Sequence, residues 1–130
     1  MANRQKILLV EDDEFTRFMM KEIIDTLEVP VDVAVNGEDG CNRITSNPED
    51  YALVLMDIHM PKLSGVGATQ MIRSSPNDPP RNVAIIAVTA DARYHDHSVV
   101  TGHGMDGFIA KPVTAGELLG LVEKYCEPAA

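Results

Sequence analysis

Carboxylates follow two apolar runs of this 130-residue sequence, and their spacing suggests phosphoryl chemistry. Asp57 comes directly after the apolar residues 51–56, and Glu11 and Asp12 follow the apolar residues 7–10. A carboxylate can act as a nucleophile and form an aspartyl phosphate. Two or three carboxylates packed together repel one another and need a cation, and hard oxygen ligands with room for water suit Mg²⁺. These residues predict an aspartate that accepts a phosphoryl group beside a bound Mg²⁺.

A hydroxyl and an amine follow two later apolar runs and would complete such a site. Thr89 ends the fourth run, and Lys111 lies before a proline after the fifth. The Lys111 ammonium is a point charge for phosphoryl oxygens, and the Thr89 hydroxyl can hydrogen-bond to another of those oxygens. Taken singly these residues are not specific, since an Asp or Thr after a strand is more often a turn or cap residue. Their conjunction at strand ends carries the inference.

Apolar runs and helical patterns alternate strictly along the chain. This alternation predicts an α/β protein with a parallel sheet covered by helices on both faces. In the flavodoxin-like doubly wound (βα)5 fold, with strand order 2-1-3-4-5, the carboxyl ends of the first and third strands flank the ligand-binding crevice. The predicted strands are residues 6–10, 31–35, 51–56, 83–88 and 106–110, and the predicted helices are 14–28, 37–45, 64–74, 92–101 and 115–125.

Several helix ends have clear local chemistry. Asn36 is expected to cap the second helix, and Thr114 with Glu117 forms a predicted capping box at the start of the fifth. Gly102 and Gly104 are expected to end the fourth helix.

The composition narrows the class of protein. A chain of 130 residues forms one domain, here with its core at about 6–126, and the natural-looking Met1 and short tail favour a stand-alone protein. A net charge of −9 argues against direct binding to nucleic acid. The two cysteines lack partners at zinc spacing, and no apolar run has transmembrane length, so we expect a cytoplasmic protein that contacts no membrane.

The first helix carries more apolar residues than one buried stripe needs. Some must be exposed, either as scattered surface residues or as a docking patch. They are Phe15, Phe18, Met19, Met20, Ile23, Ile24 and Leu27. Three histidines, His95, His97 and His103, lie on or after the fourth helix and are expected to be surface residues without a metal.

Four motifs together resemble the receiver domain of two-component response regulators. They are ILLVEDDE at 7–14, LMDIHMP at 55–61, AVTA at 87–90 and MDGFIAKP at 105–112. The resemblance covers residues 6 to about 125 and is similar in style to receivers of phosphorelays and hybrid sensor kinases.

The resemblance implies a role for each acidic residue. Asp57 would be the phosphoacceptor. Asp12 and Asp57 would bind Mg²⁺ directly together with the backbone carbonyl of His59, and Glu11 would act through water. Arg17 lies five positions after Asp12, as in the family pattern, so that Asp13 takes the variable third position; a Mg²⁺ role for Asp13 stays open.

The resemblance also implies a conformational switch. Lys111 would sense the phosphoryl group, Thr89 would be the switch hydroxyl and Phe108 the switch aromatic. Phosphorylation would pull the Thr89 hydroxyl toward the phosphoryl group, turn Phe108 inward and reshape the face made by the fourth helix, fifth strand and fifth helix. In the family the residues two after the acceptor and two after the switch threonine, here His59 and Asp91, tune the phosphoryl lifetime.

The implied partners are a phosphoryl donor and a recipient of the signal. The donor would be a histidine kinase or a histidine phosphotransfer protein that docks on the first helix. Since the sequence has no DNA-binding helix-turn-helix, the output would be a contact with a protein partner, onward phosphoryl transfer or an output domain outside this sequence.

Three other functions fit part of the pattern. A haloacid dehalogenase-like phosphohydrolase would need a second Asp where His59 stands. In a flavodoxin-like cofactor binder, the acids at 11–14 would repel the flavin phosphate. A degenerate receiver used only for interaction is disfavoured by the complete set of acids, Thr89 and Lys111.

Overall fold

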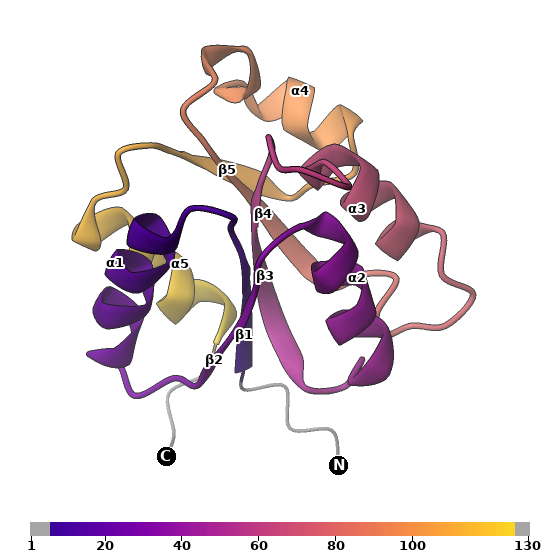
Figure 1. The fold of residues 1–130 in the computed structure, drawn as a ribbon, viewed down its shortest axis with the longest axis horizontal. Helices are drawn as coiled ribbons and strands as arrows, with labels where there is room; N and C mark the ends of the chain where they lie inside the picture. Colours follow the sequence, from indigo (N-terminus) through magenta and orange to yellow (C-terminus); the bar gives the residue numbers. More distant parts are fainter. Residues whose placement is uncertain (1–5, 127–130) are drawn as a thin grey trace.

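The computed structural model describes residues 6–126, which form one five-stranded parallel sheet in the order β2-β1-β3-β4-β5 (Figure 1). The flavodoxin-like doubly wound fold predicted from the sequence is confirmed, and each strand boundary lies within one residue of its prediction. The strands are β1 Lys6–Val10, β2 Val31–Ala34, β3 Tyr51–Asp57, β4 Ala84–Thr89 and β5 Gly107–Ala110.

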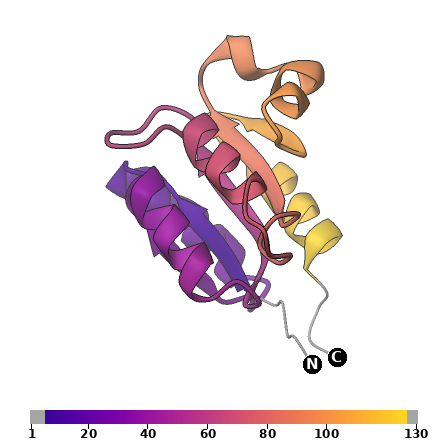
Figure 2. The same ribbon diagram turned by 90° about the vertical axis from the view of Figure 1, so that its right-hand side faces the viewer.

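The sheet separates two apolar layers. Because alternate side chains of a strand point to opposite faces, Leu8 and Val10 lie in one layer and Ile7 and Leu9 in the other. The first layer is covered by α2 (Gly37–Ser46), α3 (Gly65–Arg73) and α4 (His97–Gly102), and the second by α1 (Glu14–Asp25) and α5 (Ala115–Tyr125). Figure 2 views the molecule from the side of α2 and α3. Burial on both faces explains the unbroken apolar strands.

The strand register brings the carboxyl ends to one edge of the sheet. Val10 pairs with Met56, so the residues that follow β1 emerge beside Asp57. Asp57 pairs with Val88, the residue before Thr89, and Thr89 pairs with Ala110, the residue before Lys111. Four segments far apart in sequence therefore deliver polar side chains to the same place.

Side-chain caps fix where the helices begin. The Asn36 carboxamide accepts a hydrogen bond from the Asp39 N–H at 2.8 Å, as predicted. The Thr114 hydroxyl accepts from the Glu117 N–H at 3.3 Å and donates to the Glu117 carboxylate at 3.0 Å. Both bonds of the predicted capping pair therefore involve the Thr114 hydroxyl. Gly104 has a φ of 92°, a conformation that favours glycine, and follows the end of α4 as predicted.

The helix predicted over residues 92–101 is wrong in part. A short 3₁₀ turn spans Ala92–Tyr94, and α4 begins only at His97. Two aspartates cause the break, because each turns its carboxylate back onto a nearby N–H group: Asp91 accepts from Arg93 and Asp96 accepts from Ser98. These local hydrogen bonds start two separate turns in place of one helix.

Two apolar residues predicted on the first helix are largely exposed. Phe15 is 71% and Phe18 is 63% exposed, whereas Met20 and Ile24 are buried against the sheet. The helix ends at Asp25, three residues before the predicted end at 28. Glu28 has a φ of 58°, which is not a helical conformation. Within residues 6–126, no helix is long and apolar enough to cross a membrane.

One arginine ties together the loops at the amino ends of β4 and β5. Arg73, at the end of α3, donates to the carbonyls of Gly104 at 2.8 Å, Arg81 at 2.8 Å and Val83 at 2.6 Å. It also forms an ion pair with Asp106 at 3.0 Å. Asp106 in turn accepts from the Ile85 N–H. These contacts hold the end of the sheet opposite the candidate site.

We expect Arg73→Ala to lower the free energy of unfolding by about 2–4 kcal/mol, because it removes a charged donor from three carbonyls at once. Urea unfolding measures the change. Arg43→Ala is the matched control, since Arg43 forms only an exposed ion pair with Asp39 at 3.6 Å, and its removal should cost no more than about 0.5 kcal/mol. Equal effects of the two substitutions would contradict the role given to Arg73.

Candidate functional site

Three carboxylates converge where β1 and β3 end. One oxygen from each of Glu11, Asp12 and Asp57 lies within 4.8 Å of the other two. Glu11 and Asp57 are buried, with only 1% and 6% of their surfaces exposed, whereas Asp12 faces solvent. The cluster therefore has two enclosed acids and one side open to water.

Lys111 compensates part of this negative charge. Its ammonium lies 2.7 Å from a Glu11 carboxylate oxygen and 3.6 Å from an Asp57 carboxylate oxygen. Burial acts to lower the pKa of Lys111, but its hydrogen bond and charge interaction with Glu11 outweigh burial and the pKa is raised. Lys111 consequently remains a cation beside the acids.

The single positive charge of Lys111 does not neutralise both buried acids, Glu11 and Asp57. Burial first, and then the negative charge and hydrogen bond of Glu11, raise the pKa of Asp57 to about 7. The carboxylate form of Asp57 is thus disfavoured unless further positive charge arrives.

The backbone around the acids is held by neighbouring side chains. Asp13 caps α1: its carboxylate accepts from the N–H and hydroxyl of Thr16 at 2.8 and 2.6 Å, and its own N–H donates to Glu11 at 3.1 Å. Arg17 donates to the Glu11 carbonyl at 2.9 Å. The two hydrogen bonds from Thr16 to the Asp13 carboxylate lower the pKa of Asp13. Asp13, whose role the sequence left open, therefore serves as the helix cap.

Only glycine fits at the start of α3. A Cβ at Gly65 would lie 2.1 Å from the backbone oxygen of Asp57, and the Gly65 N–H donates to the Ile58 carbonyl at 2.8 Å. This close approach draws the loop after β3 back against the acceptor strand.

The donor set fits Mg²⁺. Carboxylate oxygens are the hard ligands this ion prefers, and the exposed side at Asp12 leaves room for the waters it retains. The excess negative charge that raises the pKa of Asp57 is what a divalent cation would offset. The predicted part of the His59 carbonyl in metal binding stays a prediction.

Thr89 ends β4, beside the acceptor strand, and Phe108 lies on β5, where it pairs with Ala87. Thr89 is buried, its hydroxyl oxygen accepts from the Asp91 N–H at 3.0 Å, and its carbonyl accepts from the Lys111 N–H at 2.9 Å. Phe108 is half-buried and packs against the apolar layer under α4. Their assignment as switch residues also stays a prediction.

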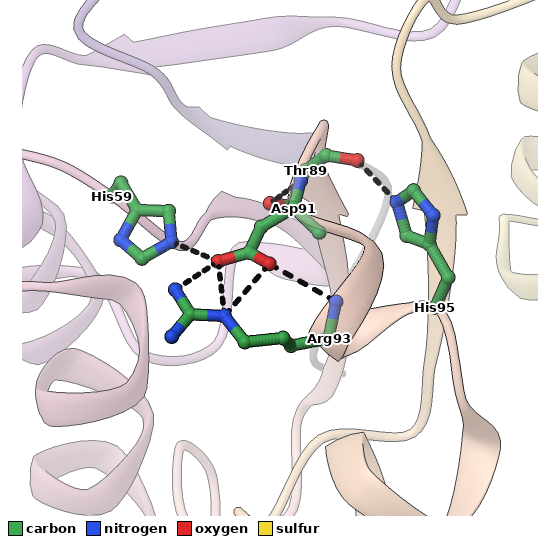
Figure 3. Close-up of polar contacts among 5 residues, drawn as sticks. All are labelled: His59, Thr89, Asp91, Arg93 and His95. Carbon is green, nitrogen blue, oxygen red and sulfur yellow. Dashed lines mark hydrogen bonds and ion pairs between the residues drawn. The ribbon is translucent and has the colours of Figure 1, made fainter.

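His95 is a contact residue that sequence reasoning missed. It was expected on the surface, yet it is half-buried, its Nε2 lies 2.7 Å from the Thr89 carbonyl oxygen (Figure 3), and its ring stacks on Phe108 with centroids 5.6 Å apart. It links the two proposed switch residues. Because it lies in the break between the 3₁₀ turn and α4, no periodic pattern could have indicated its direction.

A second missed feature is an ionic contact between two loops. Nε2 of His59 lies 2.8 Å from the Asp91 carboxylate, and the Arg93 guanidinium contacts both oxygens of that carboxylate (Figure 3). Hydrogen bonds from Arg93 and then from His59 hold the pKa of Asp91 well below its usual range. The sequence placed His59 and Asp91 beside the site but gave no sign that they touch.

Residues 7–123 match the family model of the response regulator receiver domain. The chain belongs to this family. It is a receiver domain of two-component systems, as its motifs predicted.

Curated relatives of this receiver include signalling proteins from fungi. Two-component system protein A of Emericella nidulans is 34% identical over 125 residues, covering 95% of this chain and 18% of the relative. The osmosensing histidine protein kinase SLN1 of Saccharomyces cerevisiae is 30% identical, covering 93% of this chain and 10% of the relative. The chain thus spans less than a fifth of the length of either relative. The predicted likeness to phosphorelay and hybrid-kinase receivers is confirmed.

Solved structures share the fold. The receiver domain of a sensor histidine kinase from Pseudomonas aeruginosa, described with a magnesium ion coordinated in its active site cleft, is 31% identical, with a TM-score of 0.81, 94% of this chain covered and 97% of that one. A chemotaxis protein of Vibrio cholerae is 18% identical with a TM-score of 0.80, covering 94% of this chain and 98% of that one, and shows the fold alone.

The raised pKa of Asp57 predicts how the metal-free receiver responds to pH. Because the folded pKa of about 7 exceeds the ordinary aspartate pKa of 3.8, ionisation of Asp57 opposes folding. The cost is absent below the unfolded pKa, grows as pH rises and is complete above the folded pKa. In a chelator at about pH 8, Asp57→Asn should therefore unfold with a free energy about 1–3 kcal/mol higher than the wild type.

Urea titrations of both proteins at several pH values measure this difference. The gap should narrow as the pH falls from about 8 to about 5, and Mg²⁺ should stabilise the wild type more than the variant. A variant that is less stable than the wild type in chelator at high pH would contradict this account of the buried charge.

Proposed function

We propose that this receiver accepts a phosphoryl group on Asp57 from a histidine kinase or a histidine phosphotransfer protein, in a reaction that depends on Mg²⁺. The observation that carries the proposal is the meeting of Asp57 with Glu11, Asp12 and Lys111 at one edge of the sheet. A nucleophilic carboxylate, a set of hard metal ligands and a fixed cation are the parts that phosphoryl transfer by positioning requires.

Each residue has a distinct part in the transfer. A carboxylate oxygen of Asp57 attacks phosphorus, the bond from phosphorus to the donor nitrogen breaks, and the electron pair of that bond remains on the imidazole. Lys111 moves its ion pairing from the acids to the phosphoryl oxygens, and the Thr89 hydroxyl donates to one of them. Glu11, Asp12 and Asp57 would hold Mg²⁺, which supplies charge stabilisation to the phosphoryl oxygens when bound.

The product would act as a signal. The phosphoryl group carries about two negative charges at a buried edge, in place of the single charge of the Asp57 carboxylate. Thr89 would turn toward it, and Phe108, now stacked on His95, would move inward and reshape the face of α4, β5 and α5. This face would contact a protein partner, or the phosphoryl group would pass onward. On this view the chain is a phosphoacceptor signalling domain with Mg²⁺-dependent self-phosphorylation and autodephosphorylation chemistry.

The exposed end of α1 is the candidate docking place for the donor. Phe15 and Phe18 protrude from the first turns of the helix, directly after the acids of the site. Exposed aromatics beside a reacting centre are typical of a partner surface. A single domain over residues 1–130 and a cytoplasmic location belong to the same proposal.

Intact mass after incubation with acetyl phosphate and Mg²⁺ tests the phosphoacceptor. We expect one phosphoryl adduct that hydroxylamine removes, because an acyl phosphate is labile to this nucleophile. The adduct should be absent in Asp57→Ala and in chelator. Asp50→Ala is the matched control, since Asp50 directly precedes the opposite end of the same strand.

The wild type without an adduct, when rapid release of inorganic phosphate is also excluded, would overturn the proposal in favour of an interaction module. An adduct that persists in Asp57→Ala would move the acceptor to another residue.

A further inference from the structure

Asp91, beside the candidate site, is held by the side chains of His59 and Arg93, and these three residues are called the clamp below. Asp91 is at the centre, with the Nε2 of His59 at 2.8 Å and the Arg93 guanidinium nitrogens at 2.5 to 3.1 Å from its oxygens (Figure 3). The Asp91 side chain is only 16% exposed, whereas those of His59 and Arg93 are 57% and 78% exposed. The two outer side chains therefore lie between this carboxylate and solvent.

The clamp lies at the rim of the phosphoacceptor site. His59 is the second residue after Asp57, and Asp91 is the second after Thr89. The Asp91 N–H donates to the Thr89 hydroxyl oxygen, so the backbone of Asp91 is in direct contact with the site. The clamp joins the loop after β3 to the segment after β4 at the carboxyl edge of the sheet, where the candidate site lies.

The charge of Asp91 matters because the site is already rich in acids. Glu11, Asp12 and Asp57 converge there, and Lys111 forms ion pairs with Glu11 and Asp57. A phosphoryl donor is itself an anion. An uncovered fourth carboxylate at the rim would repel it, over a distance of about 10 Å at moderate salt.

The contacts of Arg93 suit it to neutralise the charge of Asp91. Within residues 6–126 its guanidinium donates hydrogen bonds to Asp91 alone, through a forked contact with both oxygens. It is largely exposed, so its removal leaves no buried gap.

We propose that Arg93, assisted by His59, masks the charge of Asp91 and so keeps the rim of the site accessible to anionic phosphoryl donors. Arg93 is a positioning residue in this proposal, which rests on the proposed function of Asp57. Its effect is on the encounter with the donor and on the field at the rim, so it should appear in the second-order rate and depend on salt.

The test is a cycle of variants phosphorylated by acetyl phosphate in saturating Mg²⁺ at one fixed pH. Initial rates of adduct formation give the second-order rate constant for the wild type, Arg93→Gln, Asp91→Asn and the double variant. At low salt Arg93→Gln should be about three- to tenfold slower than the wild type. The difference should shrink at high salt, where charges are screened.

The double variant separates charge from structure. The double variant carries the same net charge at this pair as the wild type, so it should react about as fast as the wild type, whereas Arg93→Gln alone is slower. His97→Gln is the matched control, since His97 is exposed on the neighbouring α4 and lies outside the clamp. It should match the wild type at every salt concentration.

Three results would overturn the role of Arg93, and the third would also overturn the proposed function. A wild type that takes the phosphoryl group while Arg93→Gln reacts equally fast overturns the masking role and leaves the proposed function standing. A double variant that is as slow as Arg93→Gln at all salt concentrations shows a structural role of Arg93 and also overturns the masking role. A wild type that takes no phosphoryl group overturns both.

Discussion

The site depends on the burial of two like charges. Glu11 and Asp57 are both almost fully enclosed, and Lys111 is the cation that makes their proximity tolerable. Burying ionised groups is costly unless they are paired, so this arrangement leaves the site short of positive charge. The fold bears that cost because the surrounding strands are apolar on both faces. Under the proposed function, a cation and an added phosphoryl group would enter the site as parts of one electrostatic balance.

The fold follows from the sequence with little ambiguity. Continuous apolar runs separated by helical patterns permit few arrangements other than a doubly wound parallel sheet, and polar residues after the runs must then share one edge. The acids after β1 and β3, and Lys111 after β5, were identifiable for this reason. Helix caps such as Asn36 could be predicted equally well from the sequence, because a cap contacts a residue only three positions away.

What the sequence could not show are contacts that depend on side-chain direction across loops. Whether a helix runs unbroken through residues 92–101 depends on Asp91 and Asp96, which can either cap a new turn or face solvent. The same ambiguity hides His95, whose ring reaches Thr89 and Phe108 only because the helix is interrupted. The contact of His59 with Asp91 joins residues 32 positions apart, and no local pattern encodes it.

The hydrogen bonds of Arg73 have a mechanical consequence. They fasten the amino ends of β4 and β5 to α3 and to the loop before β4, at the far end of the sheet from Asp57. The other ends of the two strands, at Thr89 and Ala110, lie far from these contacts. A movement of Thr89 would therefore act on the last residues of the strands and on α4, while the contacts of Arg73 hold the amino ends in place.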